Sequence, residues 1–207
     1  MLTGNAIMVN LMFLLCSIPI ITMGPAWCGL YSSLRFAIRG DGWPSGFRKG
    51  FRTGFLRMLV AWIICLGVII YMAANIMTML YYKQEGYLVP LIMYCVFFLI
   101  VLMFTASLIA LNVYIPTSVM QWLKNGITLT FTTPIQTAIA GVLMWVPFAV
   151  VLIFNINAIF VLIIFIALYF TVVVLISTIL LKKALIRVKV DMIEQGLLRE
   201  DKDDYDD

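Results

Sequence analysis

Long apolar stretches without a charged residue dominate the pattern of this chain. No Lys, Arg, Asp or Glu occurs in residues 1–34, 58–82, 88–123 or 125–181. A helix needs about 20 apolar residues to cross the core of a bilayer, so these windows have room for five spans. We place the spans at 5–22, 56–82, 88–113, 134–154 and 158–181. The pattern predicts an all-α integral membrane protein with about five transmembrane helices, in a transmembrane domain of residues 1–181.

The first span is followed by a second helical stretch with a different pattern. Gly24 and Pro25 favour a helix break, because glycine adds backbone freedom and proline cannot continue the hydrogen-bond ladder. In 26–39, apolar residues recur every three or four positions and so share one face. We therefore expect an interfacial or partly inserted helix here, after the first span.

Basic and aromatic residues alternate in the segment that precedes the second span. Phe47, Phe51 and Phe55 recur every four residues, and Arg48, Lys49 and Arg52 lie between them. This spacing predicts a short amphipathic helix on the lipid headgroups. The residues that we expect to contact lipid or a partner protein are Phe47, Arg48, Lys49, Phe51 and Arg52.

The C-terminal segment, 182–207, is predicted to be a cytoplasmic basic helix followed by an acidic tail. Leu185, Val188 and Met192 share one helical face. An apolar stripe outside the bilayer must be covered by lipid, by the chain itself or by another protein. The segment is therefore a candidate for partner contact, with docking onto the chain's own helices as the alternative. Between the third and fourth spans, Ile115-Pro116 and Asn125-Gly126 are turn signals.

The distribution of basic residues predicts the orientation. Six Lys and Arg residues lie between Arg35 and Arg57, and another six follow residue 181. Cytoplasmic segments of membrane proteins are enriched in such residues. Five spans then place the N-terminus outside and the C-terminus in the cytoplasm.

Composition limits the chemistry. Hydrophobic residues make up 64% of the chain and charged residues 12%, against about 45–50% and 25% in soluble domains. Histidine is absent, which removes the commonest general base and metal ligand. The four cysteines form no CxxC pair, and no nucleotide-binding motif is present. We expect no enzymatic activity, no catalytic residue, no cofactor, no metal and no nucleic-acid partner.

Uncharged polar residues within or near the ends of the predicted spans are Asn10, Asn75, Asn112 and Gln136. They either join helices by hydrogen bonds or line a path for a neutral solute. Apart from Arg57 at the start of 56–82, the spans contain no Lys, Arg, Asp, Glu or His, which argues against a proton-coupled carrier.

The segment Asn10–Ala26, NLMFLLCSIPIITMGPA, closely resembles the N-terminal signature of the YesL-like membrane proteins, a bacterial family of unassigned biochemical function. The sequence around Arg39–Gly42 and the basic aromatic stretch also fit this family. So do Tyr114–Pro116 and Leu123–Asn125.

The resemblance implies a bacterial plasma-membrane protein that accompanies carbohydrate importers of the ABC type. The expected function is therefore a non-enzymatic accessory subunit in contact with the bilayer and with the permease subunits of such an importer. Two alternatives remain open. One is an oligomeric channel or facilitator for a small neutral solute, which requires a homo-oligomer, and the other is a membrane component of a sugar-responsive signalling system.

Overall fold

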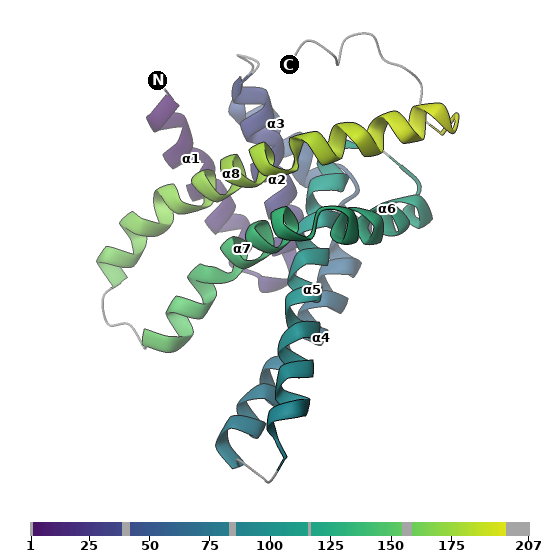
Figure 1. The fold of residues 1–207 in the computed structure, drawn as a ribbon. Helices are drawn as coiled ribbons and strands as arrows, with labels where there is room; N and C mark the ends of the chain where they lie inside the picture. The colour runs from purple at the N-terminus through teal and green to yellow at the C-terminus, as the bar shows by residue number, and fades with distance from the viewer. Residues whose placement is uncertain (1, 39–41, 83–85, 116, 155–158, 198–207) are drawn as a thin grey trace.

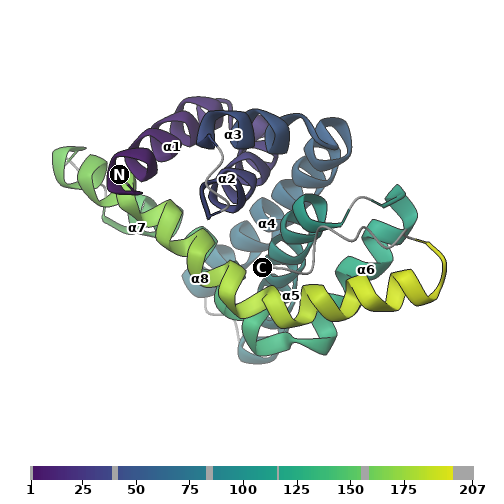
Figure 2. The same ribbon diagram turned by 90° about the horizontal axis from the view of Figure 1, so that it is seen from above.

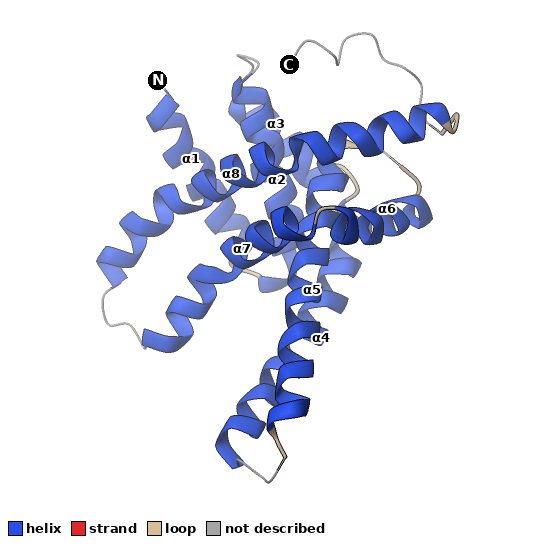
Figure 3. Cartoon of the chain, in the orientation of Figure 1, coloured by secondary structure: helices blue, strands red, loops and turns tan. Residues whose placement is uncertain are grey.

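The structure is a computed structural model that describes residues 2–38, 42–82, 86–115, 117–154 and 159–197. Every regular element in this part of the chain is helical (Figure 3), which confirms the predicted all-α membrane class. The elements are α1 (Leu2–Ser17), η1 (Ile20–Thr22), α2 (Met23–Ile38), α3 (Trp43–Arg52), α4 (Phe55–Tyr82), α5 (Leu88–Tyr114), α6 (Val119–Thr132), α7 (Pro134–Phe154) and α8 (Ile159–Glu194).

Helices α4 and α5 form an antiparallel hairpin whose far half extends beyond the other helices (Figure 1). Their bounds agree within a residue with the predicted spans 56–82 and 88–113. In the extended half most large apolar side chains are exposed, including Met77 at 71% and Val89 at 68%. These two helices are long and apolar enough to cross a membrane, so lipid is a suitable environment for this surface.

The break after α1 lies earlier than the sequence analysis placed it. Helix α1 ends at Ser17 and α2 already begins at Met23, so Gly24 and Pro25 belong to the first turn of α2. Proline is tolerated there because its missing N–H would have no intrahelical acceptor. Gly24 serves packing instead, since a Cβ added to it would lie 2.7 Å from Cβ of Trp62.

The break itself is stabilised by hydrogen bonds across η1. Thr22 Oγ1 lies 2.6 Å from the Cys16 carbonyl oxygen and 2.9 Å from that of Pro19. The indole N–H of Trp62 donates to the Ile20 carbonyl oxygen at 2.9 Å. Helix α4 therefore holds the turn between α1 and α2 in place.

Helix α2, which the sequence analysis expects to be an interfacial or partly inserted helix over 26–39, occupies the centre of the bundle. Residues 23–33 are all buried, and α2 contacts α1, α3, α4, α5 and α8. Trp27 packs with Phe13 of α1 and Phe170 of α8, at ring-centroid distances of 4.9 and 5.4 Å. Small and hydroxylated residues on the remaining faces of α2 permit this burial on every side.

Residues 119–132 form helix α6, so the turn expected at Asn125-Gly126 is wrong. A Cβ at Gly126 would lie 2.7 Å from Cδ2 of Leu108, which shows that this glycine allows α6 to pack closely against α5. Trp122 fixes the same contact by donating from Nε1 to the Leu108 carbonyl oxygen at 3.0 Å.

Within the described residues, three helical segments are long and apolar enough to cross a membrane: α4, α5 and the part of α8 from Tyr169 to Glu194. Helices α6 and α7 would add a fourth span if counted together, although they meet at a bend of 106°. The expected number was about five. Helix α1 spans 16 residues, fewer than a bilayer crossing needs. Helix α8 runs without a break past residue 181 to Glu194.

Candidate functional site

Helix α3 lies closely against α2 because glycines form its inner face. A Cβ at Gly46 would lie 2.8 Å from Cβ of Phe36, and a Cβ at Gly50 would overlap the Cys28 carbonyl oxygen and the Ser32 side chain. In return, Gly29 of α2 leaves space for the ring of Phe47. Small residues at four-residue spacing are a recurrent basis of close helix packing in membranes. The backbone of α3 is therefore fixed in rotation and in position along α2.

This packing divides the residues that the sequence analysis grouped as one contact surface. Phe47 is 3% exposed and stacks on the half-buried Phe51 at a centroid distance of 6.1 Å. Both rings belong to the interior face of α3 and are poorly placed to meet lipid or a partner. Arg48, Lys49 and Arg52 are exposed, so the outer face of the helix is cationic.

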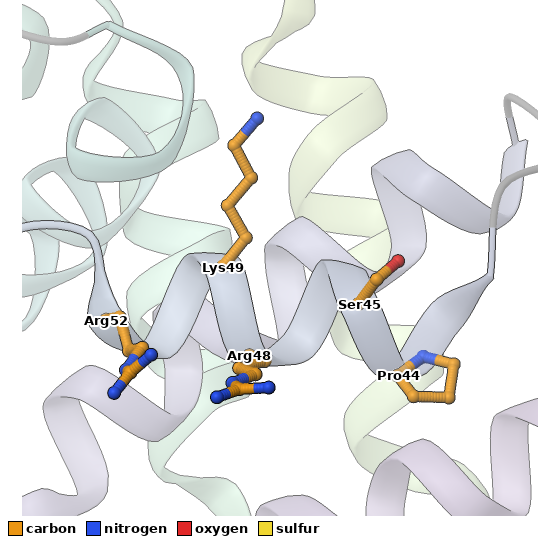
Figure 4. Close-up of a pocket in the computed structure, with 5 residues that line it drawn as sticks. All are labelled: Pro44, Ser45, Arg48, Lys49 and Arg52. Carbon is orange, nitrogen blue, oxygen red and sulfur yellow. The ribbon is translucent and has the colours of Figure 1, made fainter.

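The three cations point in two directions (Figure 4). Arg48 and Arg52 lie on the same side of α3, whereas Lys49 points to the opposite side. The Lys49 ammonium lies 5.4 Å from the centroid of the Phe36 ring, a cation–π contact. An open depression of about 460 Å³ follows this surface, lined by Pro44, Ser45 and the three cations.

Among the described residues, no carboxylate lies on α3 or on α1 and α2, which contact it. The acidic residues in the described part of the chain are Asp191 and Glu194, both on α8. The outer face of α3 thus carries positive charge without an acidic residue on α1, α2, α3 or α4. We define Arg48 and Arg52 as the arginine pair and treat it as the strongest candidate site for an anion.

A second polar cluster joins α4, α5 and the start of α6. Arg57 donates from Nε to Oδ1 of Asn112 at 2.6 Å and from Nη1 to the Thr117 carbonyl oxygen at 2.6 Å. Asn112 in turn donates from Nδ2 to the Thr53 carbonyl oxygen at 3.1 Å and to Sγ of Cys28 at 3.3 Å. The guanidinium carbon lies 5.2 Å from the centroid of the Trp122 ring.

This cluster borders an open pocket of about 390 Å³, lined by Thr53, Gly54, Arg57, Thr117, Ser118, Gln121 and Leu197. Gly54 has φ +63°, a conformation that glycine adopts without steric cost. A side chain there would also lie 2.7 Å from Asn112 Oδ1. The cluster therefore acts first as a junction between helices. Asn112 is one of the polar residues singled out in the predicted spans, whereas its partner Arg57 is not. The signal for this pair is an arginine at the start of one span and an asparagine at the end of the next.

Other polar residues singled out in the spans also serve packing. Asn10 is fully buried, and its Oδ1 accepts from Oγ1 of Thr171 on α8 at 3.0 Å. Asn75 donates to the Tyr71 carbonyl oxygen of its own helix at 2.8 Å. Gln136 is half-buried on α7. The described contacts of these asparagines favour helix packing over a shared polar path.

The apolar stripe of the C-terminal helix is covered by the chain itself. Leu185 and Met192 are 5% and 3% exposed, and Val188 packs against the same core. Asn125 of α6 donates from Nδ2 to Sδ of Met192 at 3.0 Å, and Figure 2 shows the end of α8 beside α6. The structure thus has the stripe docked onto the chain's own helices, which is the alternative that the sequence left open. These three residues do not form a free partner surface.

Taken together, the helical architecture and the apolar helices define this chain as an all-α membrane protein. Residues 6–76 match the model of the family described as protein of unknown function, DUF624. The match covers α1, α2, α3 and most of α4, and YesL-like proteins belong to that family. The chain is thus similar to that family over about a third of its length. No curated protein and no solved structure matched the chain.

Proposed function

We propose that this protein is a non-enzymatic accessory membrane subunit that associates with a carbohydrate ABC importer. The observation that carries the proposal is the α4–α5 hairpin, whose far half extends from the bundle (Figure 1). Both of its helices expose large apolar side chains. Such a hairpin offers a helical surface that permease helices can pack against within the bilayer. The carbohydrate importer itself comes from the YesL-like resemblance.

The polar interior supports a packing role over transport by the chain alone. The buried hydroxyls of Thr130 and Ser107 hydrogen bond to each other at 3.0 Å, and Asn112 is fully engaged with Arg57, Thr53 and Cys28. Side chains engaged in this way stabilise helix contacts and are poorly suited to exchange ligands with a passing solute. Any ATP hydrolysis would belong to a partner, because the sequence has no nucleotide-binding motif.

Site-specific photo-crosslinking tests the association. A photoreactive amino acid replaces Phe97, which is 51% exposed on the hairpin, or Leu111, which is 1% exposed inside the bundle. In cells that express the importer, we expect position 97 to crosslink to a permease subunit and position 111 to remain within the chain. Crosslinks from position 97 only to lipid or to a second copy would contradict the proposal.

A flux assay separates the oligomeric-channel alternative from the accessory role. Pure protein in liposomes should not accelerate entry of a small neutral sugar above that of empty liposomes. Entry that rises with protein concentration would favour a channel. A signalling role would instead show crosslinks from position 97 to a membrane sensor protein.

We also propose that this is a bacterial plasma-membrane protein with α3 and the end of α8 on the cytoplasmic side. The basic helix α3 and the basic end of α8 lie toward the same end of the molecule (Figure 1). Because cytoplasmic segments are enriched in Lys and Arg, this end is the one that we place in the cytoplasm. The start of α1 lies toward this end as well, because α2 returns alongside α1. The predicted external N-terminus requires that the chain crosses the bilayer once before α3.

Labelling with a membrane-impermeant maleimide tests the orientation. A cysteine at Gly86, in the turn of the hairpin, should react in intact cells. A cysteine at Arg52 should react only after permeabilisation. A cysteine at Thr3 then decides the side of the N-terminus, and the reverse pattern at positions 86 and 52 would overturn the proposed orientation.

A further inference from the structure

The arginine pair of α3 has the geometry of a phosphate clamp. Arg48 and Arg52 are four residues apart on one helix, so their Cβ atoms are separated by roughly 5–6 Å. Both side chains are exposed and lie on the same side of α3 (Figure 4). Two guanidinium groups at this spacing can each donate to oxygens of one phosphate, and guanidinium–phosphate pairs are among the stronger hydrogen-bonded contacts in proteins.

The glycine contacts with α2 hold this pair in place. Gly46 and Gly50 lie on the inner face of α3 and leave no space for the helix to rotate against Phe36, Cys28 or Ser32. A helix fixed in this way does not have to be ordered when the ligand binds, so less of the binding free energy is lost.

The surroundings of α3 match the level of the lipid headgroups. Helix α1 contacts α3 and exposes Leu11 at 53% and Leu15 at 54%. Leu56, four residues after Arg52 and at the start of an apolar span, is 72% exposed. A cationic surface that borders exposed apolar side chains fits a lipid, whose phosphate meets the cations while its acyl chains meet the apolar residues.

We propose that the arginine pair binds the phosphate headgroup of an anionic membrane lipid. Lys49 also lines the depression, but it points to the opposite side of α3 from the arginine pair and contacts the Phe36 ring, so it is not part of the proposed phosphate site. The Ser45 hydroxyl is not available as a donor, since it donates to the Gly42 carbonyl oxygen at 2.6 Å. This proposal is independent of the importer association and stands or falls separately from it.

Lipid binding by the purified full-length protein in mild detergent tests the proposal. The probes are phosphatidylglycerol, phosphatidylcholine and soluble glycerol phosphate, with bound lipid measured by native mass spectrometry. Each basic residue near an anionic surface contributes about a factor of five. We therefore expect Arg48→Gln, which removes one charge, to bind phosphatidylglycerol about fivefold more weakly and Arg48→Gln/Arg52→Gln about twenty-fivefold more weakly. Lys49→Gln also removes one charge from the same helix, and it should bind within about twofold of wild type.

A second double variant distinguishes loss of the phosphate contact from loss of folding. Arg48→Lys/Arg52→Lys keeps both charges but loses the planar fork, and it should fall between wild type and the glutamine variant. Equal loss in Lys49→Gln and Arg48→Gln would overturn the proposal in favour of diffuse attraction. So would unchanged binding by both double variants, or no preference for phosphatidylglycerol over phosphatidylcholine. Displacement of the lipid by an equal concentration of glycerol phosphate would identify a soluble phosphate compound as the ligand instead.

Discussion

Arg57 donates from Nε to Oδ1 of Asn112 at 2.6 Å, and this bond ties the start of α4 to the end of α5. Arg57 lies 25 residues before the end of α4 at Tyr82, and Asn112 lies 24 residues after the start of α5 at Leu88. In an antiparallel pair of equal helices, such residues lie opposite each other. Asn112 also accepts this bond while donating to α2 and to the segment after α3, so a single side chain connects the buried centre to the hairpin.

Loss of the Asn112 side chain should destabilise the protein. Asn112→Ala leaves the Arg57 Nε–H and the Thr53 carbonyl without partners, and hydrogen bonds to charged groups contribute about 1.5–3 kcal/mol each. We expect the free energy of unfolding to fall by about 2 kcal/mol, measured by denaturant titration in detergent. Asn75→Ala is the control, because Asn75 bonds only within its own helix among the described contacts, and it should change stability by less than about 0.5 kcal/mol.

Gly50 should not tolerate a methyl group. In Gly50→Ala the new Cβ would overlap the Cys28 carbonyl and the Ser32 side chain, so α3 would have to move away from α2. We expect a loss of about 1–3 kcal/mol, the usual effect of overpacking, measured as a lower midpoint of thermal unfolding. Gly67→Ala meets no atom within 4 Å. Because alanine favours helix over glycine, that variant should be as stable as wild type or more stable.

The two hairpin-flanking glycines with positive φ separate backbone strain from crowding. Gly54 has φ +63° and Gly86 has φ +78°. Gly86→Ala has open space around its Cβ and should cost about 1 kcal/mol from the left-handed backbone alone. Gly54→Ala adds crowding against Arg57 and Asn112, so its thermal midpoint should fall further. Equal midpoints for the two variants would show that the Arg57 cluster moves aside without cost.

Docking of the α8 end should depend on which face is changed. Leu185 is 5% exposed and Ile186 is 49% exposed. Leu185→Asp buries a carboxylate and should release the end of α8, which limited trypsin digestion would detect as faster cleavage at Arg187. Ile186→Asp places the same charge on the outer face and should leave the cleavage rate near that of wild type.

The sequence by itself determined the class of this protein and the bounds of its long helices. A charge-free apolar run of more than about 20 residues is typical of a membrane span, so the runs at 58–82 and 88–123 predicted the spans 56–82 and 88–113. The predicted spans also place Arg57 and Asn112 at a similar level of the two helices, although the rotation of each helix decides whether their side chains meet.

Only the tertiary structure decided what surrounds each helix. Helix α2 has an amphipathic pattern typical of an interface, yet five other helices cover it, and no local pattern records that. The packing roles of Gly24, Gly50 and Gly126 depend on contacts with residues distant in sequence, namely Trp62, Cys28 and Leu108. From the sequence alone, Gly24 and Gly126 therefore indicated a helix break or a turn, and Gly50 indicated nothing. The basic aromatic segment has an inner face and an outward arginine pair because α2 covers its phenylalanines, and this contact is not recorded in the local sequence.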